Sequence, residues 1–385
     1  MKSSITVRVA FAILAIGFFA VPILLRGVGV TATAFENRRF ADPPRVSQGW
    51  DAFQQTSRFL TDRLPLREQA VRANTELWQT FFGTAPRYGA TGGGGALPFA
   101  GKAEGTAGDG GGARARGQAR QVLPGRDGWL FVKGELERSC TPMMPFGAAL
   151  ARWRRLISIV RASGRRAMLM VPPDKGSIYG EYLPAGDLTD CARPAKRGFW
   201  QLLASEPRAS GVVQLERPLA AKKRRGGQVL YSKKDSHWTS AGSLEMVRAV
   251  LERLGKGVRL KRREVVGLPK EEYVADLSVL RGESTKDTRP AQTVRRATGA
   301  RRVHGRTLFV RDSFGDGALP FLSLYFADLR KTTWLVPPAQ LTRAIARADT
   351  VIFESVEREF AARASEQGPL GKNFLERLRR RLAAG

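Results

Sequence analysis

The sequence is poor in the residues that bind transition metals. Only two of its 385 residues are histidine and two are cysteine. A structural zinc site uses four such ligands, so the composition argues against a zinc set. The chain also lacks the glycine-rich patterns that hold phosphates, G-x-x-x-x-G-K-[ST] and a strand-linked G-x-G-x-x-G. We therefore expect neither a bound metal nor any other cofactor.

Acidic residues are scarce relative to basic ones. The chain has 64 Lys and Arg against 35 Asp and Glu, which gives a formal charge of +29 and a pI near 11.2. Such a charge attracts polyanions, whether nucleic acid, anionic lipid or acidic polysaccharide. The hydrophobic fraction of 43% is nevertheless enough for a sizeable core. The compartment decides among the polyanions, which makes the N-terminus informative.

An apolar run at residues 9–25 lies between Arg8 and Arg26. It is at the short end of the range for a spanning helix and long for a signal-peptide core. We interpret residues 1–34 as an uncleaved signal anchor. The alternatives are a cleaved signal, with a cleavage pattern at 32–34, and a buried core helix. Export of the large C-terminal part argues against nucleic acid as a partner and favours acidic glycans or anionic membrane.

The two cysteines are interpreted in the same context. An oxidising compartment allows Cys140 and Cys191 to form one disulfide. The alternative is a pair of free, buried thiols. The sequence leaves both open.

Composition divides the rest of the chain into three parts. Residues 35–84 contain two amphipathic helical patterns, at 47–64 and 67–82, and are predicted to form a helical neck. Residues 85–120 are rich in glycine and poor in large apolar side chains, which predicts a flexible insertion. Residues 121–385 are predicted to form the main folded domain.

Short apolar strands alternate with helical patterns in residues 121–385. The expected helices include 146–163 and 239–254, the second with Thr239 as its N-cap. This alternation predicts an α/β fold in three layers, with a mostly parallel sheet covered on both faces. Sites in such folds form at the C-terminal ends of strands. The expected strands are 128–132, 167–171, 212–215, 228–232, 307–312, 332–336 and 350–356.

Two polar stretches follow expected strands and suggest nucleophilic chemistry. Asp235-Ser236-His237-Trp238 comes after strand 228–232, and Asp312-Ser313-Phe314-Gly315 lies between a strand and a helix. A serine on such a turn is presented at the sheet edge, next to backbone N–H groups that can stabilise an oxyanion.

The remaining partners of such a serine are also present. Ser313 needs a base, for which His237 is the candidate, and Asp235 would orient the imidazole ring. A D-x-H triplet also occurs by chance, and Asp312 and Ser313 are equally suited to cap the next helix. His304 is interpreted as a surface or packing residue.

The chain also resembles a known family. "GRDGWLF" (125–131), "VPPDKGSIYGEYLP" (171–184), "DSHWTSAG" (235–242), "VRDSFGDG" (310–317) and "VIFESVER" (351–358) resemble, in this order, the SGNH-hydrolase-like domain of the alginate O-acetyltransferase family, AlgJ and AlgX. "ENRRF" (36–40) and "FLTDRLPLR" (59–67) are similar to its N-terminal segment. The resemblance covers residues 35–360, outside the Gly-rich insertion. The anchor, and the lack of a C-terminal carbohydrate-binding module, make the chain more similar to AlgJ.

The resemblance implies a triad of Ser313 as nucleophile, His237 as base and Asp235 as orienting acid. Site-lining or oxyanion roles would fall to Phe314, Gly315, Trp238 and Arg311, although Arg311 stands where many SGNH relatives have glycine. The resemblance also implies an acetyl donor delivered through a multi-pass membrane O-acyltransferase.

These observations together predict a polysaccharide O-acetyltransferase. The chain would be anchored in the inner membrane by a single span, with its catalytic domain in the periplasm or outside the cell. The acceptor would be an anionic polysaccharide, held by basic patches such as 222–225, which are otherwise plain solvated surface. The alternatives are a carbohydrate esterase with the same triad and a non-catalytic glycan-binding scaffold.

Overall fold

The computed structural model describes residues 121–383 except 256, 284 and 285. The predicted anchor (1–34), neck (35–84) and Gly-rich insertion (85–120) lie outside the described residues. Within the described part, no helix combines the length and the apolar character needed to cross a membrane.

The core is built around a five-stranded parallel sheet with the order β4-β3-β9-β7-β8. Its central strand β9 is buried at all five positions, as expected for a parallel strand covered on both faces. The expectation of a mostly parallel α/β sheet is therefore confirmed. The strands are β3 (Arg166–Val171), β4 (Val212–Gln214), β7 (Val303–Arg311), β8 (Phe326–Thr333) and β9 (Thr350–Glu354).

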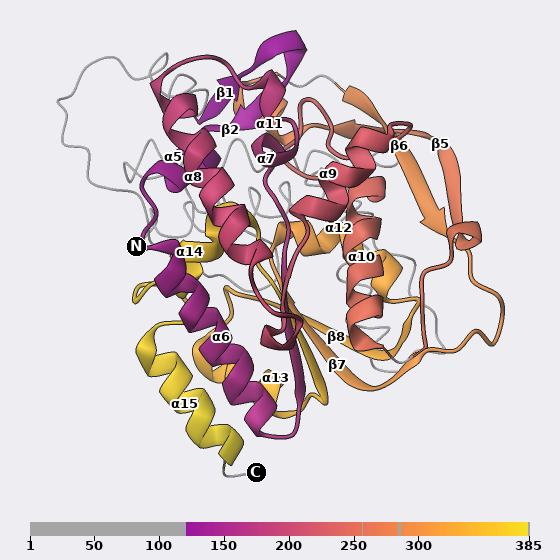
Figure 1. Cartoon of the computed structure of the whole chain (residues 1–385). Helices are drawn as coiled ribbons and strands as arrows, with labels where there is room; N and C mark the ends of the chain where they lie inside the picture. The colour runs from indigo at the N-terminus through magenta and orange to yellow at the C-terminus, as the bar shows by residue number, and fades with distance from the viewer. Residues whose placement is uncertain (1–120, 256, 284–285, 384–385) are drawn as a thin grey trace, which may run out of the picture. The chain divides into compact units, whose positions relative to one another are not determined.

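Helices cover both faces of this sheet, which gives three layers (Figure 1). Alternate residues of β3 enter separate apolar clusters: Met168 and Met170 face one side, and Leu169 and Val171 face the other. The first face packs against α9 (Glu216–Arg225), α10 (Ser240–Leu254) and α12 (Ser313–Leu322). The second face packs against α6 (Phe146–Ala162), α8 (Asp187–Ala204), α13 (Pro338–Ala346), α14 (Phe360–Ala364) and α15 (Lys372–Ala383).

Two antiparallel hairpins and three shorter helices complete the described part. One hairpin pairs β1 (Val122–Pro124) with β2 (Leu130–Val132), and the other pairs β5 (Val265–Val274) with β6 (Lys286–Val294). The strand expected at 128–132 therefore exists, but it lies in a hairpin outside the central sheet. The short helices are α5 (Lys133–Cys140), α7 (Lys175–Ile178) and α11 (Asp276–Leu280).

Two expected strands are placed differently in the structure. Residues 228–232 form no sheet strand, because only Tyr231 makes an isolated bridge, to Trp238. The apolar residues Leu230 and Tyr231 are buried in the core under α10 instead of pairing in a ladder. The strand expected at 332–336 is β8, which ends at Thr333. β8 lies at the sheet edge and contains polar and charged residues, so its first part did not have the apolar pattern of a buried strand.

Cys140 and Cys191 form a disulfide, with their Cα atoms 5.8 Å apart. The bond joins the end of α5 to α8 across a sequence separation of 51 residues. Of the two alternatives that the sequence left open, the structure contains the bonded pair.

Candidate active site

Ser313 is the first residue of α12, directly after β7 and the connecting Asp312. Asp312 caps the helix, because its Oδ1 accepts a hydrogen bond from the Phe314 N–H at 2.9 Å. Its Oδ2 accepts from the Val356 N–H at 3.0 Å and from Arg363 Nη1 at 2.7 Å. The turn that carries Ser313 is thus held by contacts with a distant part of the chain.

The charge of Asp312 is maintained by these partners. Burial opposes the charged form, but Arg363 and the Val356 N–H offset it and hold the pKa of Asp312 below its ordinary value. The neighbouring Glu354 behaves in the opposite way. Burial, together with the charge of Asp312, raises the pKa of Glu354 well above its ordinary value. The Oε2 atom of Glu354 accepts the Asp312 N–H at 2.8 Å.

His237 connects the serine to a carboxylate. Its Nε2 lies 2.9 Å from Ser313 Oγ, and its Nδ1 lies 3.0 Å from Asp235 Oδ1. The same Asp235 oxygen accepts the His237 backbone N–H at 2.8 Å, which fixes the ring relative to the acid. The structure therefore brings the three predicted triad residues into one hydrogen-bonded chain, with the geometry that activates a serine.

Trp238 and Phe314 connect the two loops of the site. Trp238 is fully buried and donates from Nε1 to the Phe314 carbonyl at 3.0 Å. The Phe314 ring lies 5.2 Å from the His237 ring and 5.3 Å from the Trp238 ring, measured between centroids. Both side chains therefore hold the His237 loop against the start of α12.

Gly315 and Arg311 occupy the start of α12. A Cβ atom at Gly315 would lie 2.6 Å from the Arg311 Cβ and 2.9 Å from Phe309 Cζ, so no side chain fits there. Arg311 is 9% exposed; its Nη2 pairs with Asp316 at 2.6 Å and its Nη1 donates to the Asp312 carbonyl at 3.2 Å. In this position Arg311 braces the helix that carries the serine.

The backbone donors for an oxyanion differ in availability. The Phe314 N–H is already bonded to the Asp312 side chain. This leaves the Ser313 N–H, at the positive end of α12, as the better candidate of the two.

Two residues that sequence reasoning missed also belong to the site. Asp276, the first residue of α11, places Oδ2 3.3 Å from His237 Nδ1. Lys175 is fully buried and donates from Nζ to the backbone carbonyls of Ser232, Lys233 and Asp235 at 3.2, 2.9 and 2.7 Å. Nothing in the local sequence marks Asp276, whereas Lys175 follows β3 inside the "VPPDKGS" motif that the resemblance already included.

The two carboxylates determine the charge of His237. Burial alone would lower the pKa of the ring, but Asp235 and Asp276 raise it to about 10. The ring in turn helps to lower the pKa of Asp276 to about 2, against the effect of burial. At neutral pH the ring is therefore mostly protonated, and only its neutral fraction can act as a base.

Asp235, His237 and Asp276 also have potential metal-ligating atoms within 4.8 Å of one another. Their oxygens already accept hydrogen bonds from Ser236 and from His237 itself. A cation at Nδ1 would have to replace these bonds. The donor set fits acid–base chemistry better than metal binding.

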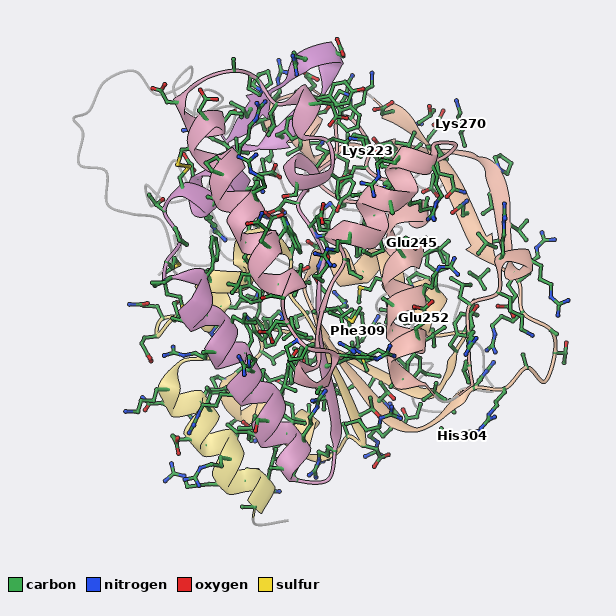
Figure 2. All side chains as sticks on the ribbon, viewed as in Figure 1. Lys223, Glu245, Glu252, Lys270, His304 and Phe309 are labelled. Carbon is green, nitrogen blue, oxygen red and sulfur yellow. A yellow bond between two sulfur atoms is a disulfide. The ribbon has the colours of Figure 1, made fainter. Side chains whose placement is uncertain are left out.

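His304, the second histidine, lies on β7 with an exposed side chain at the edge of the molecule, as expected for a surface residue (Figure 2).

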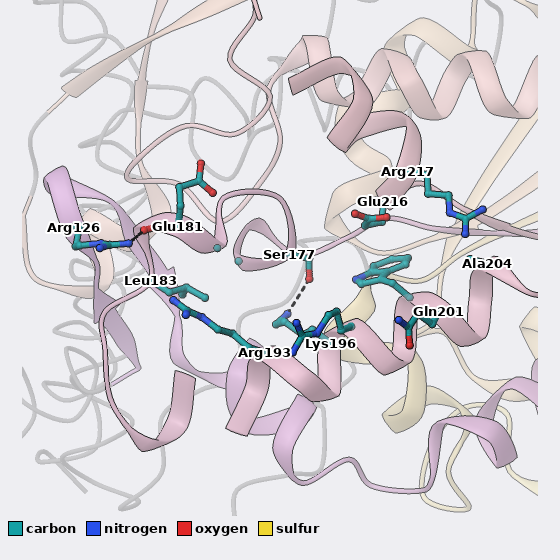
Figure 3. Close-up of a pocket in the computed structure, with 14 residues that line it drawn as sticks. Arg126, Ser177, Glu181, Leu183, Arg193, Lys196, Gln201, Ala204, Glu216 and Arg217 are labelled. Atoms are coloured by element: carbon teal, nitrogen blue, oxygen red, sulfur yellow. Dashed lines mark hydrogen bonds between the residues drawn. The ribbon is translucent and has the colours of Figure 1, made fainter. Parts of the chain in front are cut away.

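A separate cavity of about 650 Å³ lies beside the loop that follows β3 (Figure 3). None of the predicted triad residues lines it. It is lined by Arg126, Gly176, Ser177, Gly180, Glu181, Leu183, Arg193, Lys196, Arg197, Trp200, Gln201, Ala204, Glu216 and Arg217.

The floor of this cavity is connected to the site by buried ion pairs. Lys196 pairs with Glu357 at 3.0 Å, and Ser177 donates to the same carboxylate at 2.6 Å. Glu357 also accepts the Asp174 N–H at 2.9 Å, and Asp174 pairs with Arg358. The Arg358 guanidinium in turn lies 5.2 Å from the centre of the Phe314 ring. The cavity and the serine turn therefore share one packed network.

Residues 122–311 match the family model described as SGNH hydrolase-like domain, acetyltransferase AlgX. This match includes the His237 loop and ends just before Ser313. Among curated protein sequences there is no significant match.

Several solved structures are similar to the chain. The O-acetyltransferase domain of Pseudomonas putida AlgJ is 19% identical, with a TM-score of 0.49, over 67% of this chain and 98% of that one. Pseudomonas aeruginosa AlgX is 15% identical, with a TM-score of 0.48, over 69% of this chain and 66% of that one. Bacillus cereus PatB1 with a sulfonyl adduct is 12% identical, with a TM-score of 0.42, over 62% of this chain and 97% of that one.

Proposed function

We propose that this chain, whose residues 122–311 form an SGNH hydrolase-like domain of the AlgX acetyltransferase family, transfers acetyl groups to hydroxyls of an extracytoplasmic polysaccharide. The observation that carries the proposal is the hydrogen-bonded chain that joins His237 and Asp235 of this segment to Ser313, two residues beyond its end. A serine with a base and an oriented carboxylate is equipped for acyl transfer.

In the first half-reaction, an acetyl group would move from the donor to Ser313. Ser313 Oγ attacks the acetyl carbonyl carbon while its proton passes to His237 Nε2. The Ser313 N–H, at the helix N-terminus, stabilises the negative oxygen of the tetrahedral intermediate. The donor's leaving group then departs with the proton from Nε2, and an acetyl-serine remains.

In the second half-reaction, a sugar hydroxyl would accept the acetyl group, in the role that water has in an esterase. A sugar hydroxyl gives its proton to His237 Nε2 and attacks the acetyl-serine carbonyl. The bond to Ser313 Oγ breaks, and Oγ takes the proton back from Nε2. Asp235 holds the ring through Nδ1 and stabilises the imidazolium in each half. If water took the place of the sugar, the same residues would make an esterase.

The acceptor would be an anionic polysaccharide. The cavity beside the β3 loop is lined by Arg126, Arg193, Arg197 and Arg217, against Glu181 and Glu216. Guanidinium groups bind carboxylates with paired hydrogen bonds, so this lining suits acidic sugars.

The donor and the compartment are part of the same proposal. A multi-pass membrane O-acyltransferase would supply the acetyl group, and the chain would be anchored by residues 1–34 with its domain outside the cytoplasm. The Cys140–Cys191 disulfide supports an oxidising compartment. A C-terminal alkaline phosphatase fusion would be active in cells if the domain is exported, and inactive if it stays in the cytoplasm.

The activity is tested with the full-length chain, an acetyl-ester donor and acidic oligosaccharides, with products identified by mass spectrometry. We expect acetylated sugar from the wild type and none from Ser313→Ala, because the nucleophile is lost. Ser323→Ala, at the other end of α12, is the matched control and should retain activity.

The other outcomes identify the alternatives. Free acetate without acetylated sugar would identify an esterase. No turnover and no acetyl group on Ser313 would leave a glycan-binding scaffold. Acetylated sugar from Ser313→Ala at the wild-type rate would show that the nucleophile is wrongly assigned.

A further inference from the structure

Two carboxylates, rather than one, face the same nitrogen of His237. Asp235 Oδ1 lies 3.0 Å from Nδ1 and Asp276 Oδ2 lies 3.3 Å from it, while Nε2 faces Ser313. Asp235 belongs to the histidine's own loop. Asp276 comes from α11, which lies between β5 and β6 and is about forty residues further along the chain.

The structure holds Asp276 in this position through several bonds to the histidine loop. Asp276 Oδ1 accepts the Ser236 N–H at 2.7 Å, and Oδ2 accepts the Ser236 hydroxyl. The next residue of α11 is also bonded to this loop: the Leu277 N–H donates to the Lys234 carbonyl at 3.2 Å. The carboxylate therefore cannot turn away from Nδ1 without breaking contacts along the loop.

We propose that Asp276 is a positioning residue for the base: a second carboxylate that keeps the His237 ring aimed at Ser313 and stabilises its positive charge after the Ser313 proton has reached Nε2. The inference rests on the proposed function for its catalytic meaning. The arrangement itself, two carboxylates beside one ring nitrogen, does not depend on which acyl acceptor is used.

Other charged groups surround the ring and define what a titration would report. Asp235 lies on the same loop, and Lys175 of α7 faces both carboxylates. Tyr273 of β5 lies near Asp235, and Arg358 lies over the Phe314 ring that packs against His237. Of these groups, Asp276 is the one that contacts Nδ1 from an element other than the His237 loop. Removing its charge therefore changes one defined contact.

The chain offers a direct measurement, because it has only two histidines. Ring resonances of a histidine-labelled, full-length chain contain one signal pair from His237 and one from exposed His304, assigned with His304→Gln. We expect Asp276→Asn to lower the His237 midpoint by about one pH unit, since one of two adjacent negative charges is removed. The His304 midpoint serves as the internal reference.

Activity gives a second readout. We expect Asp276→Asn to lower kcat on the high-pH plateau about tenfold with little change in KM, and to move the rise of rate with pH to lower pH by the same unit. Asp276→Glu should restore the midpoint because it restores the charge. Asp187→Asn removes the same charge from an exposed position at the start of α8 and should move neither readout.

The outcomes separate this proposal from the proposed function. An unchanged His237 midpoint in folded Asp276→Asn would overturn the role of Asp276, whatever the enzyme acetylates. A lowered midpoint in a chain without acetyl-transfer activity would support the pairing and reject the function. If Asp276→Asn does not fold, Asp276→Ser keeps an acceptor for the Ser236 N–H and is judged by the same midpoint.

Discussion

At the scale of single residues, His237 determines how the site responds to protons. The ring is buried between Asp235 and Asp276, and its pKa is raised to about 10 by these carboxylates despite the opposing effect of burial. A ring with its ordinary pKa near 6.5 would be mostly neutral at pH 7.5. In this site the charged form prevails instead, and it already has a proton on Nε2, where the serine proton must go.

We therefore expect acetyl transfer to accelerate with pH. Because only neutral His237 accepts the Ser313 proton, the rate should rise about tenfold per pH unit from neutrality and level off near pH 10. The measurement is a rate–pH profile at saturating donor, with Ser313→Ala subtracting hydroxide-driven hydrolysis. A plateau already reached at pH 7 would contradict the proposed charge state of the ring.

At the scale of elements, the loop at 232–237 is held by side chains rather than by a sheet. Residues 228–232 do not pair in the central sheet, so the loop lacks the ladder hydrogen bonds that a strand would supply. Lys175 takes their place from beneath with three bonds to loop carbonyls, and its Nζ lies 5.7 and 5.3 Å from the ring centres of Trp129 and Phe131. Burial lowers the pKa of Lys175 to about 8, so its positive charge predominates at neutral pH.

Replacing Lys175 tests this arrangement. Lys175→Met keeps the length of the stem but removes the donor from the buried carbonyls of Ser232 and Asp235, each at a cost of about 1–3 kcal/mol. We expect the free energy of unfolding to fall by about 3 kcal/mol or more, and kcat to fall because the His237 loop loosens. Urea unfolding measures the first effect. Lys233→Met, at an exposed lysine of the same loop, should change stability by less than about 0.5 kcal/mol; equal stability of the two variants would contradict a structural role for Lys175.

At the scale of the whole molecule, the excess of basic residues favours binding to polyanions. A charge of +29 creates a field that attracts any acidic glycan, and four arginines line the cavity beside the β3 loop. The field alone would attract acidic glycans to the whole surface, whereas the cavity would bind them at one place.

The two contributions can be separated by mutation. We expect the double variant Arg193→Gln, Arg197→Gln to raise KM for an acidic oligosaccharide about tenfold, which corresponds to about 1.4 kcal/mol. It should also weaken the dependence of KM on salt, because these charges are screened in the wild type. Arg377→Gln with Arg380→Gln removes the same charge from exposed positions of α15 and is the control. Equal effects of both pairs would assign binding to net charge and not to the cavity.

The sequence by itself determined the features that depend on neighbouring residues. Apolar runs such as 167–171 and 350–356 predicted the parallel sheet, because buried strands need continuous apolar side chains. The strand-to-helix turn at Ser313 and the D-x-H triplet at 235–237 were evident for the same reason, since turn and spacing are local properties.

Only the tertiary structure decided the features that join distant parts of the chain. No local pattern encodes three contacts that depend on how the elements pack. They are the approach of Asp276 to His237, the hydrogen bonds from Lys175 to the loop, and the disulfide between Cys140 and Cys191. The β5–β6 hairpin was missed because Gly267, Pro269 and the charged residues 270–272 interrupt β5, so no apolar alternation marks it. The local sequence supplied the chemical groups, and long-range packing set the distances and the dielectric environment on which their reactivity depends.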